Sequence, residues 1–129
     1  RPRMERFEQL RRMKMIEALD LDEEQAVRLT VREKEFRETE REREKSRRAL
    51  HKKLKSTIDD TGSDEAIQAV MMQLNEAHHA ALSARHDYLF SLKDFLSMEQ
   101  IAKLVLFERK FSEEIKRLLS KSGKRPPRH

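Results

Sequence analysis

Two short segments of the chain carry the same helix-start pattern, and this repeat constrains the fold more than any other feature. Each segment has a leucine, then a residue that can cap a helix, then a glutamine three positions after the cap. The cap accepts a bond from an early backbone N–H of the helix, and the glutamine reaches back to the N–H of the cap. The likeness continues beyond the starts, since Leu29 matches Leu104 and Phe36 matches Phe111. We therefore predict two similar capping boxes, formed by Leu21, Asp22 and Gln25 and by Leu96, Ser97 and Gln100.

Composition favours long helices over sheets. Of the 129 residues, 41% are charged and 5% are aromatic, and there are only two Gly and three Pro. Such a profile is typical of extended amphipathic helices, and the length fits one domain, which we place at residues 1–119. Apolar residues make up only 36% of the chain. Because a core formed by one copy would be thin, we expect an intertwined or side-by-side homodimer.

Hydrophobic periodicity and helix breakers predict four helices, over residues 2–19, 23–58, 64–95 and 98–119. The break between the second and third helices contains Gly62 and a capping Ser63, so these helices form a long antiparallel hairpin. The shorter first and fourth helices flank it. Residues 120–129 are basic and rich in breakers, and we expect a disordered tail there. The predicted fold class is all-α.

Two groups of side chains suggest a surface that binds protein clients. The first is a basic stretch of the second helix without an acid inside it, made of Lys45, Arg47, Arg48, Lys52, Lys53 and Lys55. A positive face attracts acidic clients or anionic surfaces, although the same pattern also fits an ordinary solvated helix face. The second is part of the set of six methionines, Met71 and Met72. Methionine adapts to varied partners, and it also fills ordinary cores.

Histidines on the third helix raise the alternative of a transition-metal site. Glu76 and His79 have the spacing that places two ligands on one helix face. His79 and His86 lie seven positions apart, or about 10.5 Å along the axis, which is too far to clamp one ion directly. We expect no resident cofactor, and we keep Glu76, His79 and His86 as the ligand set of the metal alternative.

Catalytic and nucleic-acid-binding patterns are not evident in the sequence. With no Cys, one Tyr and two Gly, the chain offers no phosphate loop, nucleophile elbow or oxyanion turn, and we predict that it is not an enzyme. The basic stretch lacks the interleaved aromatic residues that stack on bases, so nucleic acid is not an expected partner. No apolar run approaches the roughly 20 residues of a transmembrane helix.

The two boxes resemble the LTxxQ-type boxes of the Spy/CpxP family of periplasmic stress proteins, which includes heavy-metal-resistance and metal-sensor relatives. Through box spacing and helix order, the resemblance extends from about Met4 to Leu119. Asp22 and Ser97 stand where threonine is usual in the family, and both still cap a helix.

The resemblance implies a periplasmic, all-helical and often dimeric protein shaped as a bent hairpin. Such proteins bind unfolded or stress-associated proteins without ATP, or they sense envelope stress or metal ions, so the expected partners are protein clients or a sensor or regulatory protein. Metal-sensing relatives use histidines of the first helix, and residues 2–19 contain none. The alternatives are a periplasmic heavy-metal sensor or resistance protein and a helical dimerisation module of a larger protein. The sequence begins without Met, which indicates a start inside a longer protein, and the expected periplasmic location presumes an export signal upstream of Arg1.

Overall fold

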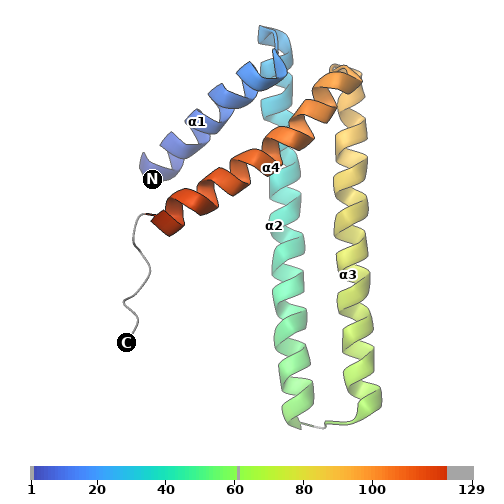
Figure 1. The fold of residues 1–129 in the computed structure, drawn as a ribbon. Helices are drawn as coiled ribbons and strands as arrows, with labels where there is room; N and C mark the ends of the chain where they lie inside the picture. The colour runs from blue at the N-terminus through green and yellow to red at the C-terminus, as the bar shows by residue number, and fades with distance from the viewer. Residues whose placement is uncertain (1, 61, 122–129) are drawn as a thin grey trace. The chain divides into compact units, whose positions relative to one another are not determined.

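Four α-helices and one short 3₁₀-helix form the part of the chain that the computed structural model describes, residues 2–60 and 62–121. They are α1 (Pro2–Leu19), α2 (Glu23–Asp60), α3 (Asp64–Ser91), η1 (Leu92–Asp94) and α4 (Met98–Lys121) (Figure 1). Over these two ranges there is no β-strand, and α2 and α3 run antiparallel as a long pair. The predicted all-α hairpin fold is therefore confirmed.

Three helix ends differ from the prediction. Helices α2 and α4 each run two residues further, so residues 120 and 121 are helical and are not part of a tail. The remainder of the predicted tail, residues 122–129, lies outside the described residues. The predicted third helix is wrong beyond Ser91, where the chain tightens into η1 and the Phe95 N–H donates to the Leu92 carbonyl, 3.1 Å away. This turn is tighter than an α-helix, and it leaves both Leu92 and Leu96 buried.

The chain divides into two compact units, which are described separately. Among the described residues, the box unit consists of residues 2–30 and 92–121, and the hairpin unit consists of residues 31–60 and 62–91. The prediction of one domain over residues 1–119 stays a prediction.

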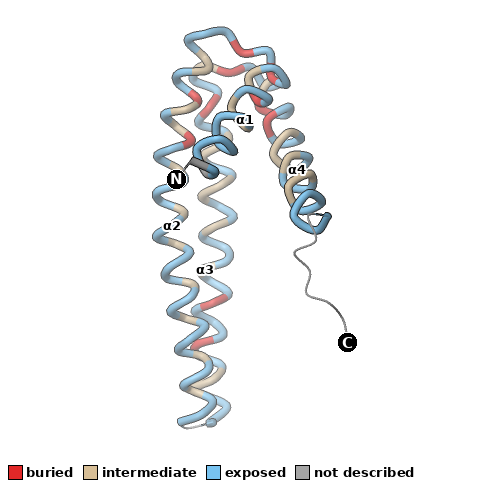
Figure 2. Tube along the Cα trace, turned by 90° about the vertical axis from the view of Figure 1, so that its left-hand side faces the viewer, coloured by how far each residue is buried: buried red, intermediate tan, exposed pale blue. Residues whose placement is uncertain are grey.

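The box unit holds most of the buried apolar side chains (Figure 2). Helices α1 and α4 pack against each other in it and run in opposite directions. Helix α1 ends where Asp20 takes a left-handed conformation, with φ of 53°. The Asp20 N–H donates to the Glu17 carbonyl at 3.2 Å, and the Leu21 N–H donates to the Ile16 carbonyl at 3.1 Å. These two bonds form a Schellman-type helix end, which Asp tolerates because its side chain is short and polar.

The hairpin unit has a much thinner core. Of its apolar side chains, Val70 and Leu74 are buried, both on α3. The rings of Phe36 on α2 and Tyr88 on α3 stack with centroids 4.2 Å apart and planes 9° apart. Between the helices, Gly62 adopts a φ of 63°, a conformation that favours glycine.

The start of α3 is capped as its sequence predicts. Ser63 Oγ accepts a hydrogen bond from the Ala66 N–H at 3.2 Å. The bond satisfies one of the early N–H groups that an α-helix leaves without an internal partner. The turn and the cap together explain why the chain reverses at this point.

Candidate functional site

Both boxes form reciprocal capping bonds. In the first box, the Gln25 N–H donates to Asp22 Oδ1 at 2.8 Å, and the Asp22 N–H donates to Gln25 Oε1 at 3.1 Å. In the second box, the Gln100 N–H donates to Ser97 Oγ at 3.1 Å, and the Ser97 N–H donates to Gln100 Oε1 at 3.0 Å. In each box, the glutamine backbone N–H donates to the cap side chain, and the glutamine side-chain oxygen accepts from the cap backbone N–H. The leucines that precede the caps, Leu21 and Leu96, are buried.

The two glutamines also bind each other, which sequence reasoning missed. Gln25 Nε2 lies 3.0 Å from Gln100 Oε1, and Gln100 Nε2 lies 3.2 Å from Gln25 Oε1. Gln25 Nε2 donates further to the Phe95 carbonyl at 2.9 Å, and Gln100 Nε2 donates to the Leu19 carbonyl at 3.3 Å. The start of α2 is therefore bonded to the segment that precedes α4, and the start of α4 is bonded to the end of α1. The occurrence of glutamine at the same position of both boxes is the only sequence signal of this pairing.

The basic stretch is partly neutralised by acids one turn earlier on α2. Arg47 lies 2.6 Å from Glu44, Arg48 lies 3.9 Å from the same carboxylate, and Lys45 lies 3.8 Å from Glu42. The hydrogen bond and the charge of Arg47 hold the pKa of the Glu44 carboxyl below its ordinary value. The basic stretch as defined from the sequence begins at Lys45 and so leaves out Glu42 and Glu44. A helical side chain contacts residues three or four positions away, so these acids belong to the same surface.

The distal part of the stretch is less compensated. Lys53 donates to Gln73 Oε1 at 3.4 Å, and no ion pair joins Lys52 or Lys55 to another residue of the described ranges. All three lysines are exposed. The excess positive charge of α2 is thus greatest over residues 52–55.

Two predicted residues, Lys53 and Met72, meet at a shallow groove between α2 and α3. The groove has a volume of about 520 Å³, and Glu76 also lines it. A second hollow of about 390 Å³ is lined by both Met71 and Met72. These methionines are 56% and 60% exposed, so they do not fill the core of the described chain. The remaining predicted residues, Lys45, Arg47, Arg48, Lys52 and Lys55, line neither hollow.

The helix order and the paired boxes agree with a known family. The family model described as "LTXXQ motif family protein" matches residues 7–106. The chain belongs to this family. No curated protein and no solved structure matches the chain. Proteins of the LTXXQ family are typically periplasmic and generally non-catalytic.

The metal alternative of this family finds no complete ligand set on the described part of one chain. Over residues 2–60 and 62–121, no group of three or more His, Cys, Asp or Glu side chains could hold a metal ion. His79 is exposed, and the ring of His86 lies 4.6 Å from that of Phe90. Glu76, His79 and His86 are therefore not brought together. Metal binding stays a prediction that calorimetry with Zn²⁺, Ni²⁺, Co²⁺ and Cu²⁺ tests.

The helices of the LTXXQ chain also lack the character of membrane spans. Within the described residues, none combines the length and the apolar content needed to cross a bilayer.

Proposed function

We propose that the chain is a periplasmic envelope-stress protein of the Spy/CpxP type that binds protein clients without ATP. Membership of the LTXXQ family supports this role. The observation that carries it is the exposure of Met71 and Met72 beside the cationic end of the basic stretch. Flexible apolar side chains can repack against unrelated partners, and nearby lysines attract acidic ones.

The shape of this surface suits weak and reversible binding. Both hollows in the hairpin unit are shallow, and their methionines stay exposed. A flat surface with adaptable side chains can hold many sequences without a precise fit. Release then requires no nucleotide-driven rearrangement, because neither of these two hollows is deep enough to enclose the client.

An aggregation assay tests the proposal. An unfolded acidic client protein is diluted from guanidinium chloride into buffer, and light scattering follows its aggregation with the full chain present at substoichiometric to equimolar amounts. We expect the chain to suppress scattering and the Met71→Ser, Met72→Ser double variant to suppress it less. A Lys52→Glu, Lys53→Glu, Lys55→Glu variant should lose activity mainly at low salt, because salt screens exposed charges.

The control removes two other exposed methionines. Met13 and Met98 are 66% and 54% exposed and lie in the box unit. Their double substitution by serine should leave the suppression unchanged. If the wild-type chain fails to suppress aggregation at both low and high salt, the proposed function is wrong.

Homodimerisation and export are parts of the same proposal. A second copy would cover apolar side chains that one chain leaves exposed, such as Leu82, which is 67% exposed. Light scattering at micromolar concentration should give the mass of a dimer, and a monomeric mass would refute this part. Cell fractionation of the product of the full gene should place the protein in the periplasm. Recovery in the cytoplasmic fraction would favour the dimerisation-module alternative.

A further inference from the structure

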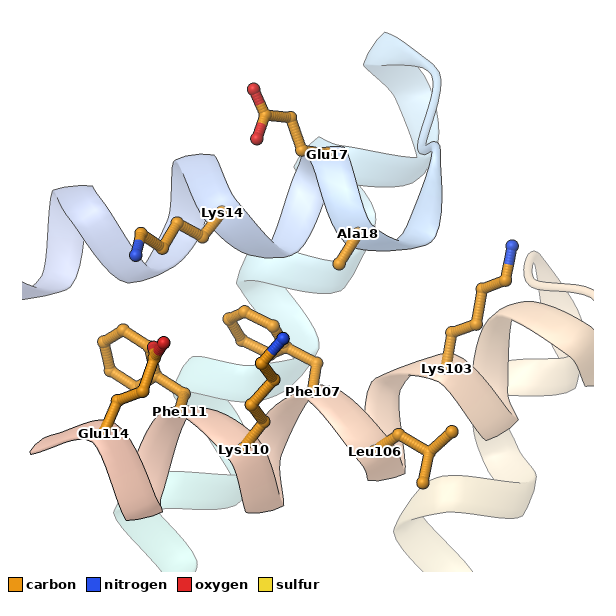
Figure 3. A pocket seen from close by; sticks show the side chains of 9 residues that line it. All are labelled: Lys14, Glu17, Ala18, Lys103, Leu106, Phe107, Lys110, Phe111 and Glu114. Atoms are coloured by element: carbon orange, nitrogen blue, oxygen red, sulfur yellow. The ribbon is translucent and has the colours of Figure 1, made fainter. Parts of the chain in front are cut away.

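A separate groove lies in the box unit, between α1 and α4. Its volume is about 590 Å³, and both helices contribute to its walls (Figure 3). Its apolar lining consists of Ala18 from α1 and Leu106, Phe107 and Phe111 from α4. The two phenylalanine rings stack with centroids 5.6 Å apart, and in Figure 3 both point toward α1. This lining offers an aromatic floor to an apolar ligand group.

Lysines from both helices stand around this floor. Lys14 comes from α1, and Lys103 and Lys110 come from α4. Lys103 pairs with Glu99 at 3.1 Å. For Lys14 and Lys110, no ion pair with another described residue is formed. Each wall therefore carries a lysine that forms no ion pair with another described residue.

The two acids of the lining do not cancel this charge. In Figure 3, the carboxylate of Glu17 points away from α4, whereas Glu114 lies beside the ring of Phe111. Glu108 lies on the same helix and pairs with Arg11 at 3.6 Å. Lysines thus outnumber carboxylates on the faces that border the floor.

Helical register extends both walls toward the far ends of the helices. On α1, Phe7 and Leu10 precede Lys14 at spacings of seven and four, so they share its face, and they are 42% and 45% exposed. On α4, Leu118 follows Phe111 and Glu114 on their face and is 57% exposed. The two helices separate toward these ends (Figure 2). The α4 wall between Lys103 and Leu118 spans about 22 Å.

The groove lies away from the two boxes. The family match ends at residue 106, whereas Phe107, Lys110 and Phe111 follow it. The boxes are capping elements at the other end of these helices.

We propose that the groove docks an amphipathic helical segment of a partner protein, with acidic side chains flanking its apolar stripe. The apolar stripe covers Phe107 and Phe111, and the acids pair with Lys14 on one wall and Lys110 on the other. Helix-in-groove recognition suits two helices, since the described chain has no strand edge to which an extended peptide could add. Charge complementarity opposes a second copy docked groove to groove, because the same lysines would face each other.

Binding of synthetic peptides to the full chain tests this inference. The probe is a fluorescein-labelled helical peptide of about 18 residues, long enough to cover the α4 wall, with leucines in one stripe and glutamates beside it. One reference peptide carries lysine in place of glutamate, and another has the first peptide's composition in scrambled order. Fluorescence anisotropy should show that the acidic amphipathic peptide binds at least about tenfold more tightly than either reference.

A pair of matched variants locates the binding. Lys14→Glu with Lys110→Glu reverses both unpaired charges of the groove and should weaken binding at least about tenfold. Lys34→Glu with Arg41→Glu makes the same change at two exposed sites of the hairpin unit that neither proposed binding surface includes, and it should leave the affinity within about twofold of the wild-type value. Circular dichroism checks that both variants remain folded.

Three results would overturn the inference. In the first, the scrambled peptide binds as tightly as the amphipathic one. In the second, the groove variant binds the peptide as tightly as the control variant does. In the third, the wild-type chain does not bind the peptide, and the groove variant differs from it in oligomeric mass. The last result would assign the groove to a second copy. This assay contains no unfolded client, so a negative result would not contradict the proposed aggregation suppression. Likewise, failure to suppress aggregation would not contradict peptide binding in the groove.

Discussion

Gln25 and Gln100 donate hydrogen bonds to each other, Nε2 to Oε1 in both directions, at 3.0 and 3.2 Å. Each oxygen also accepts the N–H of its own helix cap, Asp22 or Ser97. Each amide therefore performs a local task through its oxygen and a tertiary task through its nitrogen. A substitution that keeps the oxygens and removes the nitrogen separates the two.

Gln25→Glu makes that separation. Glutamate at this position still accepts the bond from the cap, but it loses the donors to the Phe95 carbonyl and to Gln100. We expect a loss of about 1–3 kcal/mol in the free energy of unfolding at neutral pH, measured by urea denaturation. Gln68→Glu on the exposed face of α3 is the control and should change stability by less than about 0.5 kcal/mol. Equal stability of the two variants would contradict the tertiary role.

Leu29 and Leu104 occupy equivalent positions after the two boxes, and both are fully buried. Leu29→Ala and Leu104→Ala should each lower the free energy of unfolding by about 2–5 kcal/mol, because each leaves a cavity in the box unit. Leu106→Ala removes a side chain that is 67% exposed and should cost less than about 0.5 kcal/mol. Thermal or urea unfolding measures these losses. Equal losses of stability in all three variants would contradict the prediction.

Phe36 and Tyr88 join the two helices of the hairpin unit by their ring stack. A double-mutant cycle with Phe36→Ala and Tyr88→Ala should give a coupling energy of about 0.5–1.5 kcal/mol. A second cycle pairs Phe36→Ala with Leu82→Ala, whose side chain is largely exposed. This control cycle should be additive within about 0.5 kcal/mol. A coupling of zero in the first cycle would show that the stack adds nothing beyond the burial of each ring.

Arg47 controls the ionisation of Glu44. The hydrogen bond from Arg47 is the largest cause of the lowered pKa of the Glu44 carboxyl, followed by the charge of Arg47. Arg47→Ala should therefore raise that pKa toward its ordinary value, as followed by NMR titration of the side-chain carboxyl. Arg48→Ala, which removes a more distant charge, should raise it less. The reverse order would contradict the assigned geometry.

The same pairing gives stability a defined direction with pH. The folded pKa of Glu44 is lower than the unfolded one. Its contribution is therefore complete above the unfolded pKa and disappears as the pH falls through the folded pKa. In Arg47→Ala this part of the acid dependence should be reduced.

Local rules were sufficient to predict the helix starts. Asp22, Ser63 and Ser97 cap their helices through atoms within three residues, so adjacent sequence contains the information. The antiparallel hairpin followed from a single break at Gly62 between two long periodic segments. The turn at Leu92 was missed because the apolar spacing of α3 runs through it without interruption, and only tertiary burial of Leu92 and Leu96 favours the tighter winding.

The candidate sites show the same division. The partners of Arg47 and Lys45 lie one turn away and could be deduced from helical spacing. The groove between α1 and α4 could not, since the pairing of Ala18 with Phe107 and Phe111 depends on how two segments far apart in sequence pack. Exposed apolar residues such as Met71 and Leu106 also fit a core pattern when only their spacing is considered.

The buried apolar side chains are distributed unevenly, with Val70 and Leu74 the ones that lie in the hairpin unit. Backbone segments with few buried contacts open at lower free energy than segments in a dense core. Amide protons of α3 near Gly62 should therefore exchange with solvent long before those that follow Gln25 and Gln100. The hairpin can fray and reclose repeatedly while the segments around the two glutamines keep their structure.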